Sequence, residues 1–271
     1  MITRMVAASA RAFLVAVLVV TPALLLPGTR IETTQVILLA ALVGAVLTLV
    51  EYVSPSPSLI EFRAAPPYNR IRFVSIAATV LLLTLMCRGE SLPTPLTEAL
   101  TGVAALIGRA LDFPFSPVHL VVLTAPDMAD QVRPLAGMAN AVSVGTILIF
   151  ALAVRFFDWP LNAGAFNFWI NLPLYDPTAG GDILLRLRRD SQVNLALGFL
   201  LPFLIPAALS AASVDATLVS RADPQTTIWM LSIWAFLPAS LFMRGIALMR
   251  IAVLIEEKRR RAYAQADLQA V

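Results

Sequence analysis

The stretch that decides the fold is PLAGMANAVSVGTILIFALAV, residues 134–154, which lies between Arg133 and Arg155. It holds twenty-one consecutive residues without an acidic or basic side chain. A helix needs about 20 mostly apolar residues to cross the hydrocarbon core of a bilayer. Inside that core every backbone polar group has to be satisfied within the chain, as a helix does. The stretch therefore predicts a transmembrane helix.

The distance between charged residues finds five further candidate spans. These uncharged runs comprise residues 12–29, 33–50, 73–87, 191–214 and 224–243. The run at 73–87 is short, about 22 Å, so we expect it to gain length from Ile71 and from flanking arginines that reach the interface. The sequence thus predicts an all-α, polytopic transmembrane helical bundle with about six spanning helices. Their expected bounds are roughly 12–29, 33–50, 71–87, 137–155, 192–213 and 225–244.

The composition excludes the common soluble classes. Of the 271 residues, 59% are hydrophobic and 14% are charged, and the mean hydropathy is +0.81. A soluble domain carries about 25% charged residues. A nucleic-acid-binding protein would gather its basic residues on one soluble face, whereas these residues separate apolar runs. We therefore expect residues 1–271 to form a single membrane domain surrounded by the lipid bilayer, with no nucleic-acid partner.

The N-terminal run shares some features with a secretory signal, because Arg4 and Arg11 precede the apolar residues 13–26. Residues 27–30, however, read Pro-Gly-Thr-Arg and offer no small-x-small cleavage site at the right distance. We therefore predict that this run is a retained first span.

The basic residues predict the orientation, because the cytoplasmic loops of membrane proteins are enriched in Lys and Arg. With the N-terminus inside, fifteen of the twenty basic residues fall on the cytoplasmic side and five fall outside. The five are Arg30, Arg88, Arg109, Arg133 and Arg221. We predict that both termini are cytoplasmic and that the chain lies in the inner membrane of a bacterium.

The predicted outer loop, residues 88–136, contains a candidate surface helix. Thr94 and Pro95 are suited to an N-cap and a first helical position. Apolar residues then recur at helical spacing, at Leu96, Leu100, Val103, Ile107 and Leu111. This pattern is typical of an amphipathic helix on the membrane surface. The alternative is a re-entrant pair with residues 113–126, whose prolines argue against a full span, and both readings leave the topology unchanged.

The predicted inner loop, residues 156–191, combines an aromatic segment with a short basic helix. Its aromatic residues, from Phe156 to Tyr175, favour a belt at the level of the lipid headgroups. Asp182 is a candidate N-cap for an amphipathic surface helix at residues 183–190. Residues 245–271 are expected to form a helical cytoplasmic tail. The apolar periodicity of the sixth span continues to Leu254, so we expect this helix to run past Arg244 and project into water.

Three prolines are the candidates for a hinge or a cavity, namely Pro202, Pro206 and Pro238. A proline inside a helix removes one backbone hydrogen bond and bends the helix. The freed carbonyl groups can line a cavity in a membrane protein, although prolines are also tolerated there without any function. Pro202 and Pro206 are the stronger candidates because they lie four residues apart.

Six arginines at the predicted inner face are candidates for contact with anionic lipid headgroups or with another membrane protein. They are Arg186, Arg188, Arg189, Arg259, Arg260 and Arg261. The alternative is that they belong to a solvated loop and to a basic flank that only sets the topology.

Few residues could carry chemistry. Cys87 is the single cysteine, which excludes a disulfide within the chain and a multi-cysteine metal site. His119 is the single histidine and suits the interface better than a metal site that lacks further ligands. No ionisable residue lies near the middle of a candidate span, which argues against a proton- or ion-coupled transporter. The sequence predicts no catalytic residue, metal or cofactor, and it favours a protein that is not an enzyme.

Three functions remain open. The leading hypothesis is a non-catalytic accessory or assembly factor that binds another membrane complex. The first alternative is a permease for a neutral or lipophilic solute, with a cavity beside Pro202 and Pro206. The second alternative is a membrane enzyme that acts on lipid phosphates through Asp176, Asp182 and Arg186, although their spacing matches no two-acid motif such as DxxD.

Overall fold

The computed structural model describes residues 2–28, 31–55, 58–161, 166–173, 175, 182–211 and 223–269. Helices make up most of these residues, and no strand occurs among them. The elements in chain order are α1 (Ile2–Leu25), α2 (Ile31–Val53), α3 (Tyr68–Ser91), α4 (Pro95–Leu111), α5 (Pro117–Leu123), the 3₁₀ turn η1 (Pro126–Met128), α6 (Ala129–Phe156), α7 (Phe168–Asn171), α8 (Ile183–Ala211) and α10 (Pro224–Gln269).

Six of these helices, α1, α2, α3, α6, α8 and α10, are long and apolar enough to cross a membrane. They expose many large apolar side chains, such as Leu38, Leu39 and Leu42 of α2. An apolar surface of this extent is stable in hydrocarbon and unstable in water. The prediction of an all-α chain with six helices able to span a membrane is therefore confirmed for the described residues, and the fold is that of a multi-pass membrane protein.

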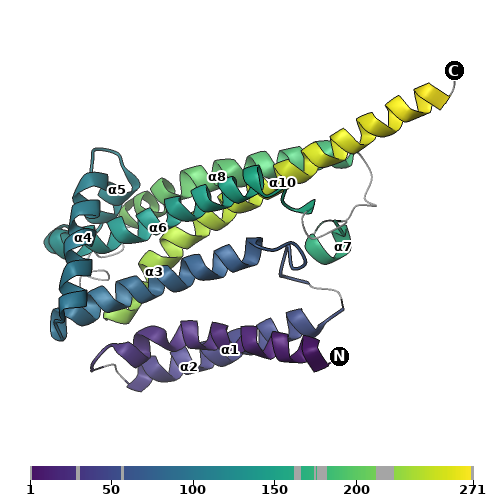
Figure 1. Cartoon of the computed structure of the whole chain (residues 1–271). Coiled ribbons are helices and arrows are strands. Elements are labelled where there is room, and N and C mark those ends of the chain that lie inside the picture. Colours follow the sequence, from purple (N-terminus) through teal and green to yellow (C-terminus); the bar gives the residue numbers. More distant parts are fainter. Residues whose placement is uncertain are drawn as a thin grey trace.

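The six long helices run along a roughly common direction, and the chain reverses between each one and the next (Figure 1). Both ends of the chain therefore lie at one end of the bundle, which we name the termini end. The short helices α4 and α5 lie at the opposite end, which we name the α4–α5 end (Figure 1). Helix α3 packs against α1 on one side and against α6 and α10 on the other. Which end faces the cytoplasm stays a prediction.

The helices extend further than the predicted spans. Helix α1 begins at Ile2 rather than at residue 12, and α3 covers 24 residues rather than residues 71–87 alone. Arg11 and Arg72 consequently lie inside helices. A charged residue is excluded from the hydrocarbon core, but it does not interrupt the backbone hydrogen bonds of a helix. Its side chain can extend to the polar interface. Residues 26–28, assigned to the first span, are not helical.

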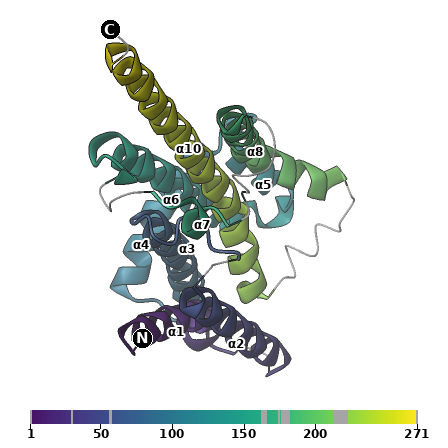
Figure 2. The ribbon, with the colours of Figure 1, turned by 90° about the vertical axis from the view of Figure 1, so that its right-hand side faces the viewer.

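One predicted break, in α8, is absent, and the predicted continuation of the last helix past Arg244 is confirmed. Helix α8 is continuous over 29 residues, so the predicted surface helix at 183–190 and the predicted span at 192–213 form one element. The last two residues of that span lie outside the described residues. Helix α10 is continuous over 46 residues, about 69 Å, which exceeds the hydrocarbon core of about 30 Å. Its final turns project beyond the other helices at the termini end (Figure 2).

Glycines allow two pairs of helices to approach closely. A Cβ on Gly137 of α6 would lie 2.5 Å from the Cα of Gly108 in α4, so these backbones touch. A Cβ on Gly198 of α8 would lie 2.9 Å from the backbone nitrogen of Phe242 in α10. Dispersion contacts between closely packed helices stabilise membrane proteins, because hydrocarbon gives no hydrophobic drive for helix association. These two crossings hold α4 on α6 and α8 on α10.

Helix α4 has the bounds that the sequence predicts, and Thr94 caps it by accepting from the backbone N–H of Thr97. Its buried face centres on Ala104 and Gly108, which pack on α6, whereas Leu96 and Val103 of the predicted apolar stripe are exposed. The amphipathic character of this helix at a membrane surface stays a prediction. Helix α5 has seven residues and is too short to span a bilayer.

Aromatic residues gather at the termini end. Trp159, expected in an interfacial belt, is fully buried against Phe62, Tyr68 and Phe150. Its indole N–H donates to the carbonyl of Ala65 over 3.1 Å. For Trp159 the sequence interpretation is wrong, because the residue packs the inter-helix loops onto the bundle instead of facing lipid headgroups.

Candidate functional site

Pro202 and Pro206 act together in α8. Because Pro206 has no N–H, the carbonyl of Pro202 loses its usual partner within the helix. The indole N–H of Trp234 in α10 donates to that carbonyl over 3.1 Å. The two prolines therefore create a polar group that α10 satisfies, and this bond fixes the orientation of the Trp234 ring.

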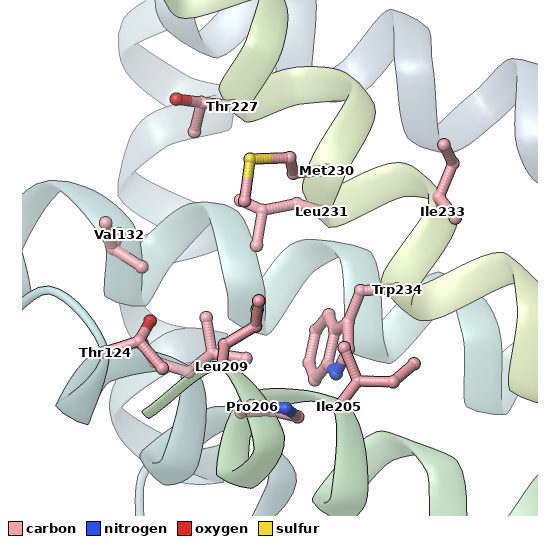
Figure 3. Close-up of a pocket in the computed structure, with 11 residues that line it drawn as sticks. Thr124, Val132, Ile205, Pro206, Leu209, Thr227, Met230, Leu231, Ile233 and Trp234 are labelled. Carbon is pink, nitrogen blue, oxygen red and sulfur yellow. The ribbon is translucent and has the colours of Figure 1, made fainter. Parts of the chain in front are cut away.

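Helix α8 diverges from α10 beyond the prolines. At Gly198 the two helices are in backbone contact, whereas the Ala211 end of α8 points away from α10 (Figure 2). A cavity of about 280 Å³ lies in the resulting space. Figure 3 shows side chains of α8 and α10 facing each other across it. The lining residues are Val121, Thr124, Val132, Ile205, Pro206, Leu209, Thr227, Met230, Leu231, Ile233 and Trp234.

The cavity is almost entirely apolar. Within the described part of the chain, no charged side chain lines it, and its two hydroxyl groups belong to Thr124 and Thr227. The Thr124 hydroxyl already donates to the carbonyl of Val121 over 2.6 Å. Such a lining can bind an uncharged molecule through dispersion and the hydrophobic effect, and it offers no group suited to proton transfer at neutral pH.

The cavity has a buried base and an exposed rim. Val132 and Leu231 are buried, and Trp234 is 5% exposed. Met230 and Ile233, in contrast, are 37% and 53% exposed on the surface of a membrane-spanning helix. The cavity therefore opens toward the region that a bilayer would occupy, from which a lipophilic molecule could enter.

The predicted prolines differ in their roles. Pro206 lines the cavity, and Pro202 contributes the carbonyl that orients Trp234. Pro238 lies outside the lining, where its carbonyl would be 3.0 Å from a Cβ on Gly198. The proline spacing signals a freed carbonyl, but nothing in the sequence connects Trp234, Met230 or Val132 with it, because those contacts depend on how the helices pack.

The six predicted lipid-contact arginines lie near acids or aromatic rings. Glu256 of α10 forms ion pairs with Arg188 of α8 and, over 2.5 Å, with Arg260. Arg259 pairs with Asp182 over 3.1 Å, which also ties α10 to the start of α8. The other three make longer contacts: Arg189 with Asp190 at 3.9 Å, Arg261 with Glu257 at 3.9 Å, and Arg186 over the Tyr175 ring at 4.6 Å. Their predicted contact with lipid stays a prediction.

His119 belongs to an ion-pair network at the α4–α5 end. Its Nδ1 lies 2.7 Å from one carboxylate oxygen of Asp112, and Nε of Arg133 lies 2.7 Å from the other. Arg133 also contacts Asp130 over 2.8 Å. The hydrogen bond from Arg133, and then that from His119, lowers the pKa of Asp112 below its ordinary value of 3.8. The network joins the end of α4 to α5 and α6.

Of the residues proposed for lipid-phosphate chemistry, the structure describes Asp182 and Arg186. Asp182 accepts from the backbone N–H of Leu184 over 3.1 Å and so caps α8, as expected. Asp176 lies outside the described residues. Among the described residues, no cluster of three His, Cys, Asp or Glu side chains could hold a metal ion.

No protein-family model, curated protein or solved structure matches this chain.

Proposed function

We propose that this chain is a non-catalytic membrane protein that binds an uncharged, lipophilic molecule in the cavity between α5, α6, α8 and α10. One observation carries the proposal: an apolar cavity lies between α8 and α10, and its lining residues Met230 and Ile233 are exposed on a helix that is apolar enough to cross a membrane. Binding of this kind is the first step of a permease for a neutral or lipophilic solute. Entry from the bilayer would require no passage through water.

The size and lining of the cavity favour a ligand that contains a ring. An apolar cavity of about 150 Å³ in a protein core stays dry and accepts benzene. A cavity of about 280 Å³ has room for a ring and a short hydrocarbon chain. The Trp234 ring is held in place by the Pro202 carbonyl, and such a ring offers a flat face for stacking. Met230 adds a flexible thioether that adapts to irregular ligands.

A fluorescence experiment tests this proposal. The purified protein in lipid nanodiscs is titrated with 1-bromonaphthalene, an uncharged ring compound whose bromine quenches tryptophan. The part of the quenching that disappears in Trp234→Phe reports on the cavity. Leu209→Phe fills the cavity. We expect it to raise the dissociation constant obtained from this quenching about tenfold, a loss of about 1.4 kcal/mol in binding free energy.

Leu204→Phe is the matched control, because Leu204 lies on the exposed face of the same helix and outside the cavity. It should leave the quenching unchanged. Equal quenching of wild type and Leu209→Phe would show that the compound reaches Trp234 without occupying the cavity, and the proposal would then be abandoned.

The accessory role is a second candidate, supported by α10. Its final turns project past the bundle and expose charged residues from Glu257 to Arg261, of which Arg259 pairs with Asp182 of α8 (Figure 2). A helix of this kind is suited to docking a soluble part of another complex. Gentle detergent extraction at native expression should yield a larger complex that is lost when residues 257–271 are deleted. Recovery of free protein alone would contradict this role.

A further inference from the structure

A second cavity lies at the termini end, between the α1–α2 pair and α3, and has a volume of about 980 Å³. One part of its wall carries Arg11, Arg63, Arg70 and Arg72. Another part is apolar and includes Leu14, Val15, Phe73 and Val74. Among the described residues, no acid lines this cavity. We propose that it binds an anionic phospholipid, with the phosphate among the arginines and the acyl chains along the apolar wall.

A braced loop forms the floor of this cavity. The Glu51 carboxylate accepts from the backbone N–H groups of Ser58, Leu59 and Ile60 over 3.0 to 3.2 Å. The Arg63 guanidinium donates to the carbonyl of Glu51 over 2.5 Å, and also to those of Ser54 and Pro55. Arg63 thus holds the loop and contributes positive charge, while the other three arginines are placed to bind the ligand.

These three arginines form no ion pair within the described part of the chain. Nε of Arg72 is buried and has no hydrogen-bond partner. Its guanidinium lies over the rings of Tyr68 and Phe236, at 5.6 and 5.7 Å. The Arg11 guanidinium lies 4.7 Å from the Tyr52 ring. A buried donor without a partner is costly, and a guanidinium meets a phosphate with paired hydrogen bonds.

The contrast with neighbouring arginines supports a ligand rather than a general excess of charge. Arg244, on α10 at the same end, has its own acid and forms two bonds of 2.6 and 2.8 Å with Glu61. Arg188 is paired with Glu256. Arg11, Arg70 and Arg72 thus line one cavity and form no ion pair among the described residues, so an anion bound there would supply their counter-charge.

The position of the cavity favours a lipid over a free anion. At the α4–α5 end the α1–α2 pair, called the hairpin below, is held to α3. Arg88 donates to the carbonyl of Leu25 over 3.1 Å, and Leu26 packs in the core. At the termini end the cavity separates the hairpin from α3. Its apolar wall belongs to helices able to span a membrane, so acyl chains can lie there while the phosphate stays at headgroup level.

Lipid retention provides the test. The full-length protein is exchanged in detergent with equal amounts of phosphatidylglycerol and phosphatidylcholine, and bound lipid is counted by native mass spectrometry. We expect about a tenfold preference for phosphatidylglycerol. The double variant Arg11→Gln/Arg70→Gln should lose most of this preference, and Arg72→Gln should lose it as well. Arg11 and Arg70 are exposed, so the double variant should still fold.

Arg155→Gln is the control, because this exposed arginine of α6 lies at the same end and outside the cavity. It should retain the wild-type preference. Equal losses in Arg155→Gln and in the double variant would overturn the proposal, since the preference would then come from the charge of the whole end. Displacement of the lipid by inorganic phosphate alone would also overturn it and would indicate a site for a free anion.

Discussion

Gly137 illustrates how one missing methyl group sets the position of a helix. Its added Cβ would lie 2.5 Å from the Cα of Gly108, and that atom cannot rotate away. We expect Gly137→Ala to lower the free energy of unfolding by about 1–3 kcal/mol, the usual cost of overpacking. Gly145→Ala in the same helix meets no atom within 4 Å and should be neutral or slightly stabilising. Unfolding of both variants in mixed micelles measures the difference, and equal stability would contradict the close contact.

Asp112 makes the stability of the α4–α5 end depend on pH. Its pKa is lowered in the folded protein, first by Arg133 and then by His119. The carboxylate therefore stabilises the fold above its unfolded pKa, close to 3.8, and this contribution is lost as the pH falls through the lower folded value. We expect Asp112→Asn to be less stable than wild type at pH 7, and the difference to shrink below about pH 4. Glu98→Gln, an exposed acid of α4, serves as the control, and a constant difference across this range would contradict the assignment.

At this scale the sequence predicts part of the candidate site. The spacing of Pro202 and Pro206 indicates a freed carbonyl, because that follows from helix geometry alone. Its partner Trp234 lies 32 residues away, and no local rule selects it. The sequence identifies Arg11, Arg70 and Arg72 only as topology signals, because spacing along the chain does not show which basic residues pair with an acid.

At the scale of elements, the long helices follow from the sequence more reliably than their ends. Uncharged runs locate each span, because hydrocarbon excludes ionised groups. They do not locate helix ends, since Arg4 and Arg11 continue α1, and Arg70 and Arg72 lie within α3. Helix α4 is the exception, because Thr94 and Pro95 define its start by local hydrogen bonding.

The hydrogen bond between α8 and α10 at Pro202 allows a test at the same scale. Trp234→Phe removes the donor to the Pro202 carbonyl and should cost about 1–3 kcal/mol of stability, as expected for an unsatisfied buried acceptor. Pro206→Ala restores a backbone N–H that can reach this carbonyl. In the Pro206→Ala background, Trp234→Phe should therefore lower the free energy of unfolding by clearly less than it does in wild type. Unfolding free energies of the two single variants, the double variant and wild type give the coupling, and strictly additive effects would contradict it.

At the scale of the whole molecule, the two cavities lie at opposite ends of the bundle and differ in chemistry. The cavity beside Pro206 is apolar, whereas the cavity beside Arg72 is basic. The number of spans and their order follow from the sequence. The cavities between helices do not follow from the sequence. Any two apolar faces can pack together, and the shapes of side chains and the positions of glycines determine how closely they do so.

The phospholipid proposal depends on the orientation of the bundle, because fifteen of the twenty basic residues are predicted to lie on the cytoplasmic side. In a Cys87→Ser background, we introduce one cysteine at each end: Ser91→Cys at the α4–α5 end and Tyr263→Cys at the termini end, both exposed positions. In intact bacterial spheroplasts, a membrane-impermeant maleimide should label Ser91→Cys. Tyr263→Cys should react only after lysis, because basic residues are retained on the cytoplasmic side. The reverse pattern would place the basic cavity outside. Labelling at both positions before lysis would contradict the odd number of spans, α6, α8 and α10, that separates Ser91 from the end of α10.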